Sequence, residues 1–147
     1  MSNLLPPCAG IIVFNGDQTI LVQTKAMRHS FPKGKRNKGE SSIEAAWREL
    51  QEETGLTKEN VQLISETEFI DETSRKEHPS VRYYVGRLIK NLSKFTFDPT
   101  ELQMVTWYNI TDAMKLDKFD DKRKAILALA YGKIKSINSL EISPLII

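Results

Sequence analysis

The pattern of hydrophobic and polar positions begins with two short apolar runs that predict a hairpin. Residues 9–14 and 19–24 are rich in β-branched side chains and are separated by Asn15-Gly16-Asp17. Asn-Gly between apolar runs is a strong hairpin signal, because both residues tolerate the positive φ of a tight turn. We therefore expect the two runs to pair as antiparallel strands.

Farther along the chain, the pattern predicts three more strands and two helices. The strands are expected at residues 61–70, 81–89 and 103–110. Polar residues with Gly or Pro predict loops at 30–39 and 71–80. Helical spacing covers 41–54 and 120–134, and the second helix carries a stripe expected to be buried: Ile126, Leu127, Leu129, Ala130 and Ile134. These elements predict an α/β (α+β) fold with a mixed sheet between helices.

The first helix has clear signals at both ends. Ser41 and Glu44 have the spacing of a capping box at the N-terminus. Gly55 suits the left-handed position that follows a helix. The helix is therefore expected to begin after Ser41 and to end near Thr54.

Size and composition favour a single globular domain over residues 1–147. Hydrophobic residues make up 40% and charged residues 27% of the chain, with a net charge of +2. The single cysteine, Cys8, cannot form an internal disulfide, and residues 1–10 lack the features of a secretory signal. No apolar stretch is long enough to span a membrane. We therefore expect a cytoplasmic protein with no membrane association, and no feature calls for an obligate protein partner.

Charge is distributed unevenly around the first helix. Five basic residues precede it without an acid among them: Arg28, Lys33, Lys35, Arg36 and Lys38. On a wheel of about 100° per residue, Glu49, Glu52 and Glu53 share one face of the helix. Like charges at this spacing repel each other. A divalent cation would offset the repulsion, because Mg²⁺ and Mn²⁺ prefer carboxylate oxygens.

The spacing of these residues resembles the Nudix box. The pattern is Gly34-x5-Glu40-x7-Arg48-Glu49-Leu50-x-Glu52-Glu53-x-Gly55-Leu56, and all nine specified positions match. The strand order over residues 9–130 is also similar to the Nudix fold. The resemblance implies an enzyme that uses Mg²⁺ or Mn²⁺ and water to cleave a diphosphate linkage in a nucleotide-like polyphosphate.

The resemblance also implies roles for individual residues. Metal ligands would be the side chains of Glu49, Glu52 and Glu53 and the backbone carbonyl of Gly34. Glu52 or a later acid would help to deprotonate the attacking water, and Arg48 would orient a box glutamate. Glu40 would connect the loop to the helix. Clustered cations can stabilise the charge that develops during such a reaction.

The segment before the box reduces the number of substrate classes to expect. Phe31-Pro32-Lys33-Gly34-Lys35 is similar to mRNA-decapping and dinucleoside-tetraphosphate-hydrolysing members of the family. Glu101-Leu102, with Trp107 six residues after the glutamate, resembles the decapping segment that supplies a further metal ligand or general base. Lys33 and Lys35 flank Gly34 and are expected to bind substrate phosphates.

Several hypotheses stay open. Capped RNA and dinucleoside polyphosphates are ranked ahead of diphosphoinositol polyphosphates, and a catalytically silent RNA- or nucleotide-binding module is the alternative of another class. The sequence indicates no rival site. His29 and His78 are isolated and are expected to be ordinary surface histidines. Tyr83 and Tyr84 are expected to pack in the sheet rather than to stack on a base.

Overall fold

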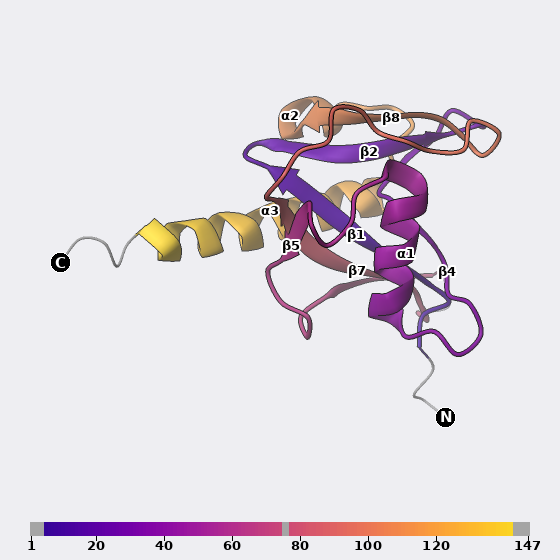
Figure 1. The fold of residues 1–147 in the computed structure, drawn as a ribbon, viewed down its shortest axis with the longest axis horizontal. Helices are drawn as coiled ribbons and strands as arrows, with labels where there is room; N and C mark the ends of the chain where they lie inside the picture. Colours follow the sequence, from indigo (N-terminus) through magenta and orange to yellow (C-terminus); the bar gives the residue numbers. More distant parts are fainter. Residues whose placement is uncertain (1–4, 75–76, 143–147) are drawn as a thin grey trace.

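A computed structural model describes residues 5–74 and 77–142 of the chain. The strands are β1 (Cys8–Asn15), β2 (Gln18–Thr24), β3 (His29–Ser30), β4 (Lys33–Lys35), β5 (Val61–Leu63), β6 (Ile70–Thr73), β7 (Pro79–Leu88) and β8 (Leu102–Asn109). The helices are α1 (Ser42–Thr54), α2 (Ile110–Ala113) and α3 (Asp121–Ile142). Figure 1 shows these elements in one mixed α+β arrangement, which confirms the predicted fold class.

The expected hairpin forms the centre of the sheet. β1 and β2 pair antiparallel through Phe14↔Thr19 and Asn15↔Gln18, and Gly16 in the turn has a φ of 58°. On its other edge β1 runs parallel to β7, from Cys8↔Val81 to Phe14↔Arg87. The sheet is mixed because this parallel pair lies beside the antiparallel β1–β2 pair. Parallel neighbours need a long crossover connection, which the segment between β1 and β7 provides.

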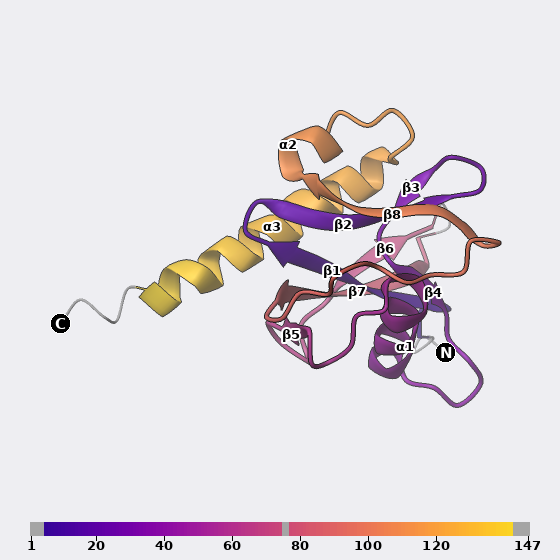
Figure 2. The same cartoon turned by 45° about the horizontal axis from the view of Figure 1, so that its top comes forward.

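Helices cover both faces of the sheet. Side chains that alternate along β1 enter two separate hydrophobic clusters: Ile12 and Phe14 pack with α3, whereas Ile11 and Val13 pack with α1. Figures 1 and 2 show α1 and α3 on opposite sides, with the C-terminal part of α3 extending beyond the strands. Among the described residues, no helix has the length and apolar character that crossing a membrane requires.

The ends of α1 follow the signals in the sequence. The Ser41 side chain accepts from the Glu44 N–H, and the Glu44 side chain accepts from the Ser41 N–H, so the capping box is present. Gly55 adopts the left-handed conformation at φ 87° and ends the helix. These caps satisfy backbone groups that α1 would otherwise leave without partners.

Several boundaries differ from the predictions. The expected loop at 30–39 contains β4, and the expected loop at 71–80 contains most of β6 and the start of β7. The expected strand at 61–70 is extended only at β5 and again at Ile70. These differences arise from tertiary pairing: β4 pairs with β1, and β5 and β6 both pair with β7. None of these short strands has a strong apolar alternation of its own, so the local sequence does not predict them.

The C-terminal helix also differs in part. α3 is longer than the 120–134 segment expected from its apolar stripe. Ile126, Leu127, Ala130 and Ile134 are buried as expected, but Leu129 is 60% exposed. The prediction for Leu129 was wrong, because the sheet covers only one side of the helix and Leu129 lies outside that side.

Candidate active site

The acidic face of α1 lies directly against the short strand β4. The Lys33 N–H donates to the Glu53 carboxylate at 3.1 Å, and the Arg48 guanidinium donates to the Lys35 carbonyl at 2.7 Å. Between these two contacts, the Glu49 carboxylate lies against Gly34. Three consecutive strand residues therefore meet three residues of the helix, and this pairing holds the box glutamates in place.

Gly34 is required at its position for steric reasons. A Cβ atom built on Gly34 would overlap the carboxylate of Glu49. The overlap explains why this position excludes a side chain, a reason that spacing alone does not give. The predicted metal contact of the Gly34 carbonyl stays a prediction.

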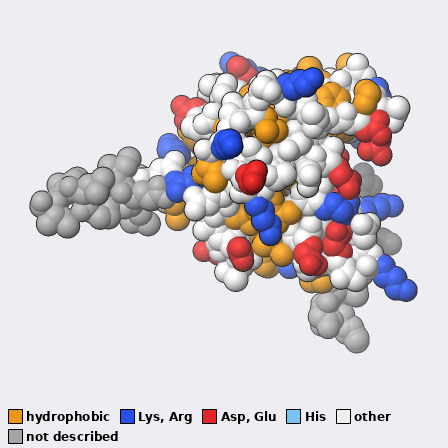
Figure 3. Space-filling view, viewed as in Figure 1, with side chains coloured by type: hydrophobic (Ala, Val, Ile, Leu, Met, Phe, Trp, Pro, Cys, Tyr) orange, Lys and Arg blue, Asp and Glu red, His pale blue; other side chains and the backbone are white. Residues whose placement is uncertain are grey.

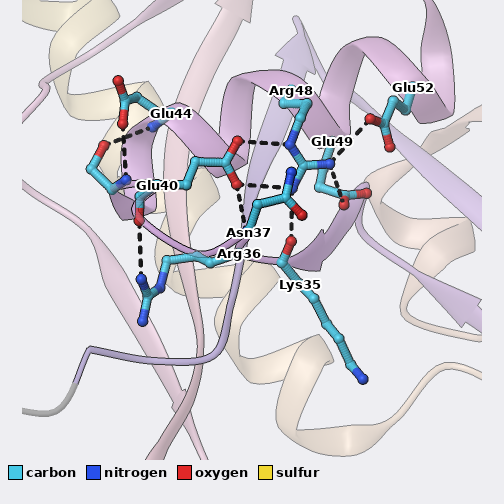
Figure 4. A network of polar contacts seen from close by, with 9 residues as sticks. Lys35, Arg36, Asn37, Glu40, Glu44, Arg48, Glu49 and Glu52 are labelled. Carbon is cyan, nitrogen blue, oxygen red and sulfur yellow. Dashed lines mark hydrogen bonds and ion pairs between the residues drawn. The ribbon is translucent and has the colours of Figure 1, made fainter.

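Arg48 is the centre of an ion-pair network, shown in Figure 4. Its guanidinium contacts Glu40 at 2.7 and 3.0 Å, Glu49 at 3.0 Å and Glu52 at 3.1 Å. The Arg48 side chain is only 26% exposed. The expected pairing of Arg48 with box glutamates is therefore present, whereas its catalytic role stays a prediction.

Glu40 connects the loop before α1 to this network. It accepts from the Asn37 N–H at 2.8 Å, and its carbonyl accepts from Arg36 at 3.0 Å. The hydrogen bond from Arg48, followed by the one from Asn37, lowers the pKa of Glu40 to about 2. Glu40 therefore stays charged at neutral pH. These contacts are those expected of a structural connection between loop and helix.

The pKa values of Glu49 and Glu53, the carboxylates nearest β4, are raised, whereas that of Glu40 is lowered. Burial, followed by the negative charges of Glu49 and Glu101, raises the pKa of Glu53 to about 8, although the Lys33 N–H lowers it. Burial also raises the pKa of Glu49, and the charges of Glu52 and Glu101 act in the same direction. Glu101 therefore lies close enough to interact with both box glutamates, although it is far from them in sequence. Without added positive charge, burial and the neighbouring acids therefore disfavour the charged forms of Glu49 and Glu53.

The composition of the cluster fits a divalent cation. As they stand, no three acidic, histidine or cysteine side chains in residues 5–74 and 77–142 form a ready ligand set. Glu49 is paired with Arg48, and Glu53 accepts from the Lys33 N–H. The donors are nevertheless carboxylate oxygens with raised pKa values, and Glu52 has a 56% exposed side chain. A hard cation such as Mg²⁺ favours such oxygens and displaces their protons.

Basic residues of the preceding loop divide into two groups. Lys33 is half-buried and acts electrostatically on Glu53, while Lys35 is exposed and its side chain points away from the Arg48 network in Figure 4. Arg36 instead donates to the carbonyls of Pro6 and Glu40 at 2.9 and 3.0 Å, so it stabilises the loop. This structural use of Arg36 was not apparent from the sequence. Figure 3 shows acidic and basic side chains next to each other over the α1 side of the molecule.

Replacing Arg48 by Ala is expected to lower both turnover and stability. The change leaves Glu40 and Glu49 without their main partner, at a cost of about 1–3 kcal/mol in the free energy of unfolding. Arg48→Lys should recover only part of the loss, because an ammonium lacks the planar fork that bridges several carboxylates. Urea unfolding and hydrolysis assays measure the two effects, with Lys38→Ala as a control at an exposed position. Wild-type stability and turnover in Arg48→Ala would contradict the assignment.

Comparisons with known proteins agree with this geometry. The family model described as NUDIX domain matches residues 4–129. The chain is 33% identical over 111 residues to mRNA decapping complex subunit 2 of Schizosaccharomyces pombe, covering 72% of this chain and 14% of that protein. It is 38% identical over 63 residues to an RNA pyrophosphohydrolase of Sodalis glossinidius, covering 42% of this chain and 36% of that protein. The chain thus spans well under half the length of these two curated relatives.

Comparison with solved structures shows that the fold is also similar to known hydrolases. The Ap4A hydrolase of C. elegans, solved as a binary complex, superposes with a TM-score of 0.71 at 24% identity, covering 90% of this chain and 98% of that one. A UDP-X diphosphatase superposes with a TM-score of 0.68 at 16% identity, covering 92% of this chain and 66% of that one. At these identities the likeness shows the shared fold. Because the family model matches residues 4–129 and the complete box runs from β4 through α1 to Leu56, the chain belongs to the NUDIX family.

Proposed function

We propose that the chain is a metal-dependent pyrophosphohydrolase in which water cleaves a diphosphate linkage of a nucleotide-like polyanionic substrate. The observation that carries the proposal is the cluster of Glu49 and Glu53 against β4, with Glu52 beside it and Glu101 acting on it electrostatically. A helix selected only for stability would not gather these acids at one strand. The cluster is suited to a reaction in which negative charge needs positive charge nearby.

Metal ligands in this proposal are Glu49, Glu52, Glu53 and Glu101, with the Gly34 carbonyl. When bound, Mg²⁺ or Mn²⁺ supplies positive charge that stabilises the phosphate oxygens as the linkage breaks. Arg48 contributes by holding Glu49 and Glu52 in fixed orientations. Glu52 has one oxygen on Arg48 and the most exposed side chain of that network, so it can accept the proton of the attacking water.

Glu101 provides a further test of the site. It is exposed in the turn before β8, and it raises the pKa of both Glu49 and Glu53. Glu101→Gln is therefore expected to lower kcat about tenfold or more, with a smaller change in KM, if the carboxylate binds metal or accepts a proton. Steady-state kinetics measure this split, and Glu59→Gln is a control at an exposed acid outside the cluster. Equal kcat values for Glu101→Gln and the wild type would remove Glu101 from the mechanism.

For the substrate, we propose the 5′ end of RNA, with capped RNA as the first candidate. Support comes from the names of the two curated relatives, an mRNA decapping complex subunit and an RNA pyrophosphohydrolase. Dinucleoside polyphosphates are the second candidate, because Phe31-Pro32-Lys33-Gly34-Lys35 is also similar to the enzymes that cleave them. Diphosphoinositol polyphosphates are the alternative when neither nucleotide substrate is cleaved.

The two lysines beside Gly34 are expected to bind phosphates beyond those at the carboxylate cluster. Lysine acts as a flexible point charge, which suits a polyphosphate chain. Lys33→Ala and Lys35→Ala should therefore raise KM severalfold for capped RNA and dinucleoside polyphosphates, and less for a short nucleoside diphosphate sugar. Added salt should also raise KM, because several phosphates are neutralised.

A panel of these substrates, assayed at two salt concentrations, tests the proposed function. Lys38→Ala is the matched control, since Lys38 is an exposed lysine of the same loop. Equal effects on every substrate would show that the lysines do not respond to the length of the polyanion. Tight binding of RNA without any product, with Mg²⁺ present, would instead support the silent binding module.

A further inference from the structure

Strand β8 lies at one side of the sheet and is paired along only one of its edges. Among the described residues it pairs with β2 alone, from Gln18↔Asn109 to Thr24↔Leu102. Figures 1 and 2 show β8 beyond β2, on the side of the sheet away from β7. In the described part of the chain, no backbone hydrogen bond from a loop or helix reaches residues 103–109. The outer edge of β8 therefore presents backbone donors and acceptors that need water or another strand.

The other strands that pair with a single neighbour in the described chain are short. β3 has two residues, β4 and β5 have three each, and β6 has four, whereas β8 has eight. A short edge strand offers little backbone to another chain, and this is one way in which proteins prevent their sheets from joining. β8 is long enough to receive a further strand.

Three of the short strands are also covered by other parts of the chain. On β3, the His29 N–H donates to the Lys118 carbonyl at 3.0 Å, and His29 is 8% exposed, contrary to its expected surface position. On β4, two backbone groups form hydrogen bonds with side chains of α1. On β6, the Thr73 carbonyl accepts from the Lys122 ammonium at 2.9 Å. These contacts protect the short strands, so β8 differs from them in both length and cover.

β8 also lacks the residues that usually keep edge strands apart. Its sequence is Leu-Gln-Met-Val-Thr-Trp-Tyr-Asn, without a charged residue, a proline or a glycine. By contrast, β4 carries two lysines and β6 carries two acids. The register with β2 is unbroken from Gln18↔Asn109 to Gln23↔Met104, so no bulge interrupts this stretch. A regular, uncharged edge of this length favours association with another strand.

The composition of β8 favours a second copy of the same strand as the partner. Two β8 strands can pair antiparallel without bringing like charges together, because neither carries a charge. Pairing about a two-fold axis uses the same edge on both copies, so the assembly closes at two chains. Head-to-tail addition would instead leave a new free edge on each added copy.

We propose that two copies of this chain associate through antiparallel pairing of β8 with β8. The two sheets then form one continuous sheet across the two-fold axis. At about 3.4 Å per residue, each β8 contributes an edge of roughly 27 Å. The inference concerns assembly and does not rest on the proposed hydrolase function.

Thr106→Lys tests this interface, because Thr106 lies near the middle of β8. In a two-fold pair centred on residue 105 or 106, the two copies of this position are diagonal or direct neighbours, about 5–8 Å apart. Two ammonium groups there repel each other, so the dissociation constant of the dimer should rise about fivefold or more. Thr106→Val is the matched control, because valine keeps the branched shape without a charge, and it should leave the constant nearly unchanged.

A charge exchange makes the test specific to this strand. Thr106→Glu alone should weaken the dimer as Thr106→Lys does. An equimolar mixture of the two variants should dimerise at least as tightly as the wild type, because opposite charges then face each other across the axis. Recovery in the mixture also shows that both variants are folded.

Sedimentation and hydrogen exchange measure the two parts of the proposal. The wild-type mass should rise with concentration from one chain to a plateau at two chains. The amides of residues 103–109 should exchange more slowly in the dimer than in the monomeric Thr106→Lys variant, while those of the central strand β1 stay unchanged. A wild type that stays monomeric at every concentration, with rapid exchange at β8, would overturn the proposal and leave the edge to a different chain.

Two further outcomes would also overturn the proposal. A dimer that neither Thr106→Lys nor Thr106→Glu weakens would have its interface elsewhere. A mass that keeps rising without a plateau would show open-ended addition instead of a closed pair. If neither variant folds, rapid exchange of residues 103–109 in a wild-type dimer would still reject the β8 interface.

Discussion

Replacing Glu53 by Gln is expected to lower turnover by at least about two orders of magnitude. Glu53 is the box glutamate held most directly by β4, through the Lys33 N–H at 3.1 Å. Gln keeps the oxygen that accepts this hydrogen bond, but it loses the negative charge that a cation needs. Glu52→Gln should have an effect of similar size, because Glu52 is the proposed acceptor of the proton from water.

The stability of the Glu53→Gln variant shows whether its turnover falls because the carboxylate is missing or because the fold is disturbed. The pKa of Glu53 is about 8 in the folded protein, against an ordinary value of 4.5. Without metal, the charged form is therefore disfavoured by folding, and the destabilisation grows as the pH rises from about 4.5 to about 8. The metal-free variant should match the wild type at pH 4 and be the more stable protein at pH 8.

Thermal unfolding in chelator at these two pH values, together with kcat for the same preparations, measures both effects. Glu59→Gln is the control, since this exposed glutamate lies outside the cluster. An inactive Glu53→Gln that also melts well below the wild type at pH 8 would indicate a structural role. Wild-type turnover in both Glu52→Gln and Glu53→Gln would reject the proposed chemistry.

Much of the fold could be predicted, because its central elements carry strong local signals. Asn15-Gly16 indicated the β1–β2 hairpin, and Ser41, Glu44 and Gly55 indicated the ends of α1. β4 and most of β6 were expected to be loops, because their extended form comes from pairing with β1 and β7 rather than from their own side chains. Local patterns contain little information on such pairing.

Some features of the candidate site could likewise be predicted from the sequence, and others could not. The spacing of the box was enough to expect Arg48 beside box glutamates, since helix geometry places i and i+4 together. The overlap at Gly34 and the loop contacts of Arg36 depend on how β4 approaches α1, so they needed three-dimensional structure. Burial of His29 depends on the segment that joins α2 to α3, more than 80 residues later. No signal near His29 indicates it.

Removal of divalent cations is expected to abolish hydrolysis completely. Without a cation, the charged forms of Glu49 and Glu53 are disfavoured, and the cluster supplies no positive charge to stabilise an anionic diphosphate. Lys33 and Lys35, the positive groups on either side of Gly34, cannot replace this charge at the carboxylates. Activity should return when Mg²⁺ or Mn²⁺ is added, with proton release, because the cation displaces protons from carboxyl groups with raised pKa values.

The most direct measurement follows the products of capped RNA and of a dinucleoside polyphosphate by mass spectrometry while Mg²⁺ is titrated into metal-free protein. We expect no product in chelator, a saturable rise with Mg²⁺ for at least one of these substrates, and no rise in the Glu52→Gln, Glu53→Gln double variant. Undiminished hydrolysis in chelator, or a double variant that follows the wild-type titration, would contradict a metal-dependent carboxylate site on α1.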